Sequence, residues 1–191
     1  MCMILATGAA MAQKQFTFGP KIGVDYTHYW GEDVNHGGQL NYQAGLFMEY
    51  RFTNKFSIAP EVVFAAQGGK FNWYNESSIK ISTTDHMNYV NIPVMLKYYV
   101  VPALSIDFGP QVGINVYKKY TDKWEIGGNE LKESDEYAHV KTVDFGVGLG
   151  LTYNITNDVF VQGRYTLGLT KVFEYNEAKN GNAQIAIGYR F

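Results

Sequence analysis

The feature that most constrains the fold of this chain is a strict alternation of apolar with small or polar residues. Within residues 184–191 the apolar residues occupy every odd position: Ile185, Ile187, Tyr189 and Phe191. A period of two predicts a β-strand with one apolar and one polar face. The same alternation returns in seven further stretches, at residues 16–30, 40–52, 56–67, 88–100, 104–116, 142–153 and 159–169.

The segments that connect these predicted strands are alternately short and long. Short turns fall at residues 53–55, 101–103 and 155–158, and long polar loops lie near 31–39, 67–87, 117–141 and 170–183. Outer-membrane barrels have short periplasmic turns and long extracellular loops. The sequence therefore predicts an all-β fold, an eight-stranded antiparallel transmembrane up-and-down β-barrel with short periplasmic turns and long extracellular loops.

The composition is consistent with such a barrel. Charged residues make up 18% of the 191 residues, below the usual share of about 25%, whereas aromatic residues make up 16%. A formal net charge of −2 argues against nucleic acid as a partner. No apolar run of about 18 residues occurs, so a transmembrane helix is not expected. The single cysteine, Cys2, allows no disulfide within the chain.

The first twelve residues differ from the rest of the sequence. They are apolar and small and end in Ala10-Met11-Ala12, which fits the end of a secretory signal with an A-x-A cleavage site. The basic region expected before such a segment is missing, because Lys14 is the first positive charge. We interpret residues 1–12 as the remnant of a truncated signal peptide and residues 13–191 as a single outer-membrane β-barrel domain.

The glycines indicate which face of the sheet points outward. Ten glycines fall on the polar face, from Gly19 to Gly188. Inside an eight-stranded barrel, small residues make room for long charged side chains. Aromatic residues also gather at both ends of the apolar face, as expected for two membrane interfaces. We therefore expect lipid to contact the apolar face and the polar face to line the lumen.

The polar face carries positive and negative charges in near balance. An unpaired charge inside a narrow barrel costs several kcal/mol, so these residues are expected to neutralise one another. The sequence predicts a structural charge network in the lumen, formed by Lys21, Asp25, Glu49, Arg51, Glu61, Lys97, Asp107, Asp144, Arg164 and Arg190.

Three segments resemble a known family. Residues 16–24 (FTFGPKIGV), residues 89–98 (YVNIPVMLKY) and the terminal residues 189–191 (YRF) are similar to the PorT-like outer-membrane β-barrel family of Bacteroidetes-type bacteria. The resemblance spans residues 16–191 and implies the fold and the membrane rather than a defined activity. One member class is linked to protein secretion and gliding. Ile187, Tyr189 and Phe191 also match the positions of the insertion signal read by the barrel-assembly machinery.

The sequence carries no convincing catalytic, cofactor or metal motif. The four histidines, at positions 28, 36, 86 and 139, fall in loops or at the loop ends of strands without metal-ligand spacing. The expectation is therefore a protein without a cofactor and without enzymatic activity. Aromatic residues in the long loops are the candidates for contacting a partner: Trp73, Tyr74, Tyr120 and Trp124.

We expect a monomer in the bacterial outer membrane with a structural or surface-interaction role through its extracellular loops. Its expected partners are outer-membrane lipid, the barrel-assembly machinery during insertion, and an unidentified extracellular or periplasmic molecule. The alternatives are a small barrel enzyme or narrow channel, and a soluble lipocalin-like ligand carrier.

Overall fold

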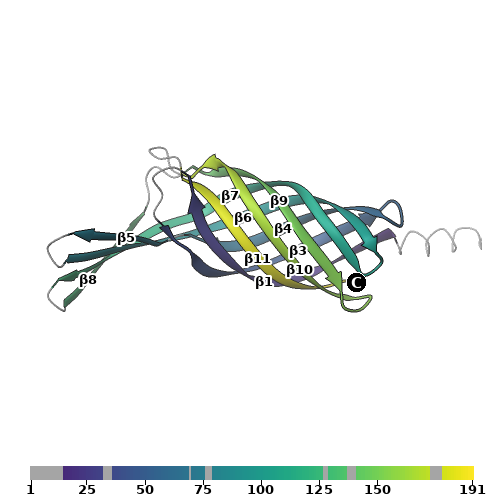
Figure 1. Cartoon of the computed structure of the whole chain (residues 1–191), viewed down its shortest axis with the longest axis horizontal. Helices are drawn as coiled ribbons and strands as arrows, with labels where there is room; N and C mark the ends of the chain where they lie inside the picture. The colour runs from purple at the N-terminus through teal and green to yellow at the C-terminus, as the bar shows by residue number, and fades with distance from the viewer. Residues whose placement is uncertain are drawn as a thin grey trace, which may run out of the picture.

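The barrel is closed by antiparallel pairing of eight strands in chain order (Figure 1). The computed structural model describes residues 15–31, 36–68, 70–75, 79–126, 129–136, 141–172 and 178–191. The barrel strands are β1 (Phe16–Trp30), β3 (Gln39–Arg51), β4 (Phe56–Gln67), β6 (Ile79–Val101), β7 (Leu104–Ile126), β9 (Val143–Asn154), β10 (Val159–Lys171) and β11 (Lys179–Tyr189). Pairing of β1 with β11 joins the first strand to the last. The predicted fold is confirmed.

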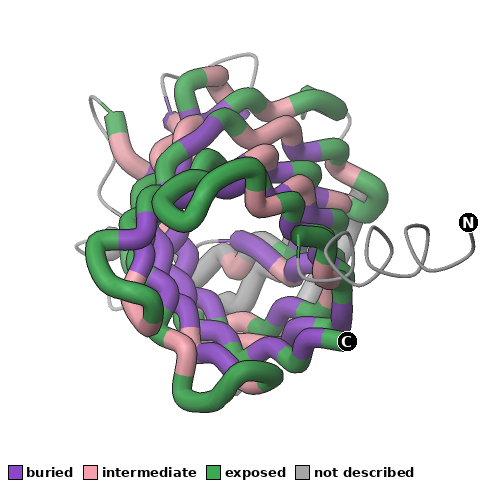
Figure 2. Tube along the Cα trace, turned by 90° about the vertical axis from the view of Figure 1, so that its right-hand side faces the viewer, coloured by how far each residue is buried: buried purple, intermediate pink, exposed green. Residues whose placement is uncertain are grey.

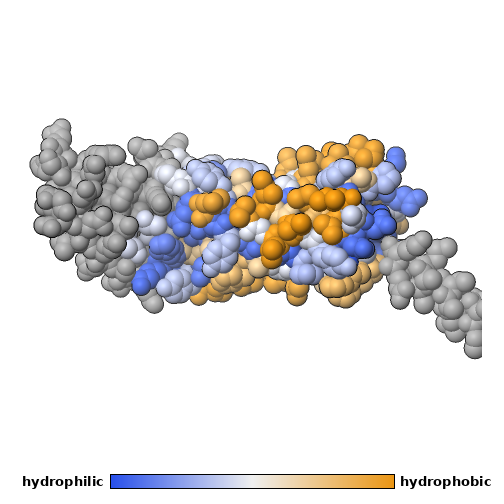
Figure 3. Space-filling model, turned by 90° about the horizontal axis from the view of Figure 1, so that it is seen from below, coloured by the Kyte–Doolittle hydropathy of each residue, from blue (hydrophilic) through white to orange (hydrophobic). Residues whose placement is uncertain are grey.

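Apolar residues point outward and polar residues point into the lumen. In β11, Ile185 and Ile187 are 64% and 46% exposed, whereas Gln184 and Ala186 between them are buried. Figure 2 shows buried and exposed residues alternating around the closed ring, and Figure 3 shows apolar residues gathered on the outer wall. The predicted orientation is confirmed. The soluble lipocalin-like alternative is wrong, because it needs the apolar face inside.

Aromatic side chains form a belt at the turn end of the outer wall. The rings of Phe18 and Phe191 lie 5.6 Å apart between centroids, and those of Phe56 and Tyr98 lie 5.1 Å apart. Tyr189 packs edge-on against Phe191 at 5.1 Å. Amphipathic and aromatic rings are typical of the interface between a membrane and water.

Two of the short turns are built by the same threonine contact. The Oγ1 of Thr53 accepts a hydrogen bond from the amide of Phe56 at 2.9 Å, and the Oγ1 of Thr156 accepts one from the amide of Val159 at 2.9 Å. A hydroxyl that accepts from a backbone amide a few residues later favours a tight turn. This contact explains why a Thr-Asn pair begins both turns.

The other end of the barrel extends far beyond the cylinder. Strands β6 and β7 have 23 residues each, whereas the other barrel strands have between 11 and 15. Strand β5 (Lys70–Asn75) pairs with residues 79–84 of β6, and β8 (Asn129–Glu136) pairs with residues 119–126 of β7. We call these parts of β6 and β7, which lie beyond the barrel, their upper parts. These four strands project together from one side of the barrel (Figure 1). The short strand β2 (His36–Gly37) pairs with β5.

The long connections predicted at 67–87 and 117–141 are present at this end of the barrel, and over most of both ranges they are strands rather than irregular loops. The backbone pairing of β6 with β7 continues as far as Lys80 opposite Glu125, so the polar residues of these two segments belong to a continuous antiparallel sheet. Polar residues occur in strands when both faces of a sheet can meet water. The interpreted signal-peptide remnant, residues 1–12, lies outside the described residues. No helix in the described part of the chain is long and apolar enough to cross a membrane.

Candidate functional site

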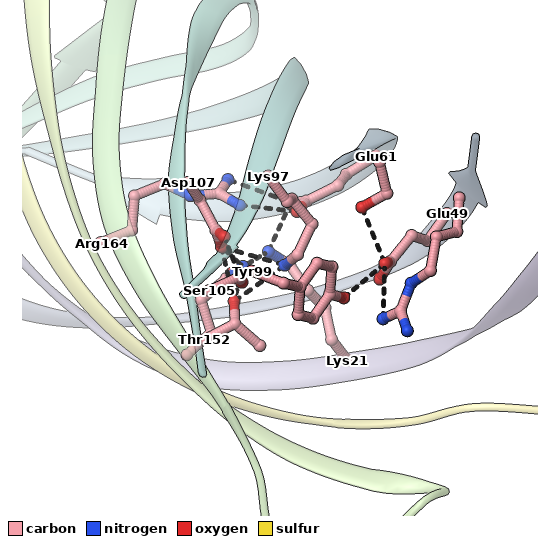
Figure 4. A network of polar contacts seen from close by, with 12 residues as sticks. Lys21, Glu49, Glu61, Lys97, Tyr99, Ser105, Asp107, Thr152 and Arg164 are labelled. Carbon is pink, nitrogen blue, oxygen red and sulfur yellow. Dashed lines mark hydrogen bonds and ion pairs between the residues drawn. The ribbon is translucent and has the colours of Figure 1, made fainter. Parts of the chain in front are cut away.

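The centre of the lumen is closed by an ion-paired triad. The carboxylate of Glu61 accepts hydrogen bonds from Lys21 Nζ at 2.5 Å and from both terminal nitrogens of Arg164, at 2.6 and 3.1 Å (Figure 4). The three side chains come from β4, β1 and β10 and are at most 3% exposed. Both carboxylate oxygens are used by cations, which offsets the cost of burying the charges.

A second cluster surrounds Asp107. Lys97 Nζ donates to Asp107 Oδ2 at 3.0 Å and to Thr152 Oγ1 at 2.9 Å. Ser105 Oγ donates to Asp107 Oδ1 at 2.6 Å. Gln162 joins this cluster to the triad, because its Oε1 accepts from Lys21 at 3.1 Å and its Nε2 donates to Asp107 at 3.3 Å.

The third cluster lies at the turn end of the lumen, around Glu49. Its Oε1 accepts hydrogen bonds from Ser57 Oγ at 2.8 Å and from the hydroxyl of Tyr99. Arg51 and Arg190 approach the same carboxylate at 3.6 and 3.7 Å. Charge alone therefore does not decide which donors bind the glutamate.

Two of the ten residues predicted for the lumen network have no cation within ion-pairing distance in the described part of the chain. Asp25 is fully buried, and neither of its carboxylate oxygens has a hydrogen-bond partner there. Asp144 accepts hydrogen bonds from Thr170 Oγ1 and from Asn180 Nδ2, the latter at 2.7 Å. The structure thus joins eight of the predicted residues in three clusters and leaves these two carboxylates outside them.

Glycine makes room for the largest charged side chain of the triad. A Cβ added at Gly150 would lie 3.1 Å from the Cβ of Arg164, and one at Gly148 would lie 3.3 Å from its Cδ. Both contacts are tighter than ordinary van der Waals packing. The two glycines on β9 therefore allow Arg164 on β10 to lie across them toward Glu61.

The sequence interpretation missed the neutral residues that complete these clusters. Tyr99, Ser105, Thr152 and Gln162 all occupy lumen positions of the alternation, so their register was a signal that could have found them. It also missed an apolar layer inside the lumen toward the extracellular end. This layer consists of Tyr29, Met87, Tyr89, Val172 and Ala178.

The candidate contact residues lie on the sheet that projects from the barrel. The strand register places Trp73 opposite Ile81, Ile81 opposite Trp124, and Trp124 opposite Leu131. These four positions form one row across β5, β6, β7 and β8, and hence belong to one face. The odd positions of β6 line the lumen lower down, as at Tyr89, so the row continues the lumen side of the barrel wall.

The other two candidates divide between the faces. Tyr120 lies four residues before Trp124 and occupies the same face. Tyr74 follows Trp73 directly and occupies the opposite face. The side chains of these four residues lie outside the described part of the structure. The backbone nevertheless shows that the candidates belong to two surfaces.

The predicted insertion signal lies on the outer wall at the turn end. Ile187, Tyr189 and Phe191 are 46%, 44% and 68% exposed. Their recognition by the assembly machinery stays a prediction. Within the described ranges, no group of three or more histidine, cysteine, aspartate or glutamate residues is arranged to hold a metal ion.

Residues 11–174 of the chain match the family model of the outer membrane protein beta-barrel domain. The chain belongs to this family. The family match, the closed barrel and its apolar outer wall together show that the protein is a bacterial outer-membrane β-barrel whose strands span the membrane. The short turns are then periplasmic, and the projecting sheet is extracellular. No curated protein matches the sequence.

Solved structures show the same fold at low sequence identity. Ail, the attachment invasion locus protein of Yersinia pestis, is 14% identical with a TM-score of 0.50, over 93% of this chain and 99% of Ail. Its complex with the heparin analogue sucrose octasulfate is 13% identical with the same TM-score and coverage. Neisserial surface protein A is 13% identical with a TM-score of 0.46, over 93% of this chain and 97% of that chain.

Proposed function

We propose that this outer-membrane barrel is a non-enzymatic surface-interaction protein, and that its contact surface is the extracellular sheet. This sheet consists of β5, the upper parts of β6 and β7, and β8. The observation that carries the proposal is the length of β6 and β7, which have 23 residues each. A transmembrane strand needs only about 9–11 residues.

The extra length lifts the sheet well clear of the membrane. About ten residues beyond the length of the other strands correspond to roughly 33 Å of extended chain. Pairing with β5 and β8 on either side satisfies backbone groups that two lone strands would expose. A sheet built to this height is suited to meeting a large molecule at the cell surface.

The lumen-side face of the sheet defines the chemistry of the partner. Its upper part holds apolar and aromatic positions: Phe71, Trp73, Ile79, Ile81, Trp124, Ile126 and Leu131. Nearer the barrel the same face holds Asp122, Glu133 and Asp135. Tryptophan and tyrosine are common among residues that dominate binding energy. We infer a protein partner whose contact region is apolar at its centre and basic at one side.

The lumen clusters support a structural role inside the membrane rather than a channel. Lys21, Glu61 and Arg164 meet across the lumen and bind one another, whereas Lys97 and Asp107 form a buried pair between the neighbouring strands β6 and β7. An ion that passed through would have to break these buried pairs. The interior of an eight-stranded barrel is also just wide enough to be filled by side chains.

A peptide-selection experiment tests the contact surface. The purified barrel in neutral maltoside micelles is used to select peptides from a phage-displayed library. We expect enrichment of peptides with apolar centres and basic flanks. A double variant, Trp73→Ser with Trp124→Ser, is expected to bind these peptides at least about tenfold more weakly. The peptides should also bind intact cells that carry the wild-type barrel.

Tyr74→Ser provides the matched control, because it removes an aromatic residue from the opposite face of the same strand. Its affinity for the selected peptides should equal that of the wild type. The proposal fails if the double variant binds the peptides as tightly as the wild type, or if Tyr74→Ser loses as much affinity as the double variant. Heat-modifiable gel migration shows that each variant is folded.

Within this family we further propose a PorT-like barrel of a Bacteroidetes-type outer membrane, preceded by a signal peptide and inserted by the assembly machinery as a monomer. The segments at 16–24, 89–98 and 189–191 support this assignment. The outward positions of Ile187, Tyr189 and Phe191 support the insertion signal. Replacing Phe191 with serine should lower the amount of folded barrel in the outer membrane, measured by fractionation of cells.

A further inference from the structure

The periplasmic mouth of the barrel contains a cavity of about 600 Å³ that the lumen clusters do not fill. It is surrounded by the ends of strands and by the turns at Pro102 and Asn157. Its charged wall consists of Glu49, Arg51 and Arg190. This cavity lies at the opposite end of the barrel from the extracellular sheet, so it is independent of the function proposed above.

The two arginines in this wall have N–H groups that Glu49 does not use. Arg51 and Arg190 lie 3.6 and 3.7 Å from the oxygens of Glu49. These distances allow electrostatic attraction but exceed the length of a hydrogen bond. The nearer donors to Glu49 are the hydroxyls of Ser57 and Tyr99. The guanidinium groups are therefore available to another acceptor.

Aromatic rings hold both guanidinium groups in place. The Arg51 guanidinium lies 3.9 Å from the ring centroid of Tyr99, and the Arg190 guanidinium lies 4.6 Å from that of Phe160. Stacking of this kind fixes a guanidinium without using its N–H donors. The site is thus ordered before any ligand binds, which lowers the entropy cost of binding.

The charge and burial of this wall favour an anion. Two guanidinium groups face one carboxylate, which leaves an excess of one positive charge. The Arg190 side chain is only 8% exposed and that of Arg51 is 35% exposed, so an anion between them would meet less competition from water. Arginine binds carboxylate and phosphate groups through two parallel hydrogen bonds.

We propose that the cavity at the periplasmic mouth binds an oxyanion, a carboxylate or phosphate group, through the N–H groups of Arg51 and Arg190 that Glu49 does not use. The group can belong to a soluble periplasmic molecule or to the headgroup of a membrane lipid that reaches over the rim. Both present the same oxygens to the guanidinium groups. Glu49, which accepts hydrogen bonds from Ser57 and Tyr99, lines the same cavity.

Calorimetric titration of the folded barrel tests this site, with sodium pyrophosphate as the probe in neutral maltoside micelles. We expect saturable binding to the wild type. Arg51→Gln and Arg190→Gln should each bind at least about tenfold more weakly, because each removes charge-assisted hydrogen bonds. Lys55→Gln is the matched control, since it removes an exposed periplasmic cation outside the cavity and should bind as the wild type does.

A second arm identifies the source of the oxyanion. The same titration is carried out in nanodiscs of zwitterionic lipid, with and without phosphatidylglycerol. Weaker pyrophosphate binding in the presence of the anionic lipid supports the site and assigns it to a headgroup, and equal binding supports a soluble ligand. The proposal is overturned if the wild type does not saturate at millimolar pyrophosphate, or if both arginine variants bind as tightly as Lys55→Gln.

Discussion

Two clusters in this barrel have the same number of positive and negative groups but different bonding. In the centre of the lumen, Glu61 lies between Lys21 and Arg164. At the periplasmic mouth, Glu49 lies between Arg51 and Arg190. Each cluster therefore has one carboxylate and two cations. In the first the cations are 2.5 and 2.6 Å from the carboxylate oxygens, and in the second they are 3.6 and 3.7 Å away.

The neutral donors also differ between the two clusters. No serine or tyrosine hydroxyl donates to Glu61 among the described residues, so the cations bind it directly. At Glu49 the hydroxyls of Ser57 and Tyr99 both donate to Oε1, the oxygen nearest Arg51, and neither arginine is within hydrogen-bond distance of the carboxylate. The comparison shows that a glutamate near two cations can be used in two ways. At Glu61 the cations bind the carboxylate directly and close the lumen, whereas at Glu49 the arginines keep free N–H donors that can bind another anion.

The largest effect is expected from removing the central carboxylate. Glu61→Gln leaves Lys21 and Arg164 buried without an anion, and should lower the free energy of unfolding by about 3–5 kcal/mol. Urea unfolding in lipid vesicles, followed by heat-modifiable gel migration, measures this change. Replacing all three residues with methionine should restore stability to within about 1 kcal/mol of the wild type. A loss below 1 kcal/mol for Glu61→Gln would contradict the buried-triad account.

A smaller loss is expected at the second buried pair. Lys97→Met removes the cation from Asp107, which keeps its hydrogen bonds from Ser105 and Thr152. The free energy of unfolding should therefore fall by about 2–3 kcal/mol, less than for Glu61→Gln. The same urea experiment measures it. Adding Asp107→Asn to Lys97→Met should recover part of the loss, and no recovery would show that the pair is not the cause.

The barrel could be predicted from the sequence because one simple period controls it. Inward and outward residues alternate along each strand, which predicts the two faces. The glycines of the polar face and the aromatic ends of the apolar face then predict that residues such as Ile185 and Ile187 lie on the outer wall. The turns could be predicted as well, because Thr53 and Thr156 provide the same local contact. These features depend on neighbours within a few residues of the chain.

The bonding around Glu61 and the full extent of the extracellular sheet could not be predicted in the same way. The partners of Glu61 are 40 and 103 residues away in sequence, so their pairing depends on how strands meet across the lumen. Balanced charge does not distinguish the bonding of Glu61 from that of Glu49. In β6 above the membrane, the apolar residues Ile79 and Ile81 are followed by the polar run from Ser82 to His86, which interrupts the apolar alternation that marks the strand inside the membrane.

A third change tests whether the hydroxyl at Glu49 keeps the mouth open. Tyr99→Phe removes one donor from Glu49 Oε1, and should lower stability by about 1 kcal/mol. Glu49 Oε1 can then accept a hydrogen bond from Arg51 instead, which leaves fewer arginine donors for pyrophosphate. The affinity for pyrophosphate should therefore fall severalfold, although the phenylalanine ring still packs against Arg51. Calorimetry measures the affinity. An unchanged or higher affinity would show that the tyrosine hydroxyl does not direct the arginines.

Arg51→Gln is expected to have the smallest effect on stability but a large effect on anion binding. Arg51 is 35% exposed and lies 3.6 Å from Glu49, so its ion pair is weak and partly screened. Arg51→Gln should change the free energy of unfolding by less than about 1 kcal/mol, while pyrophosphate affinity falls at least about tenfold. Urea unfolding and calorimetry on the same sample measure both. A stability loss as large as that of Glu61→Gln would mean that Arg51 is part of the structural plug, and that the two clusters differ only in distance from the membrane centre.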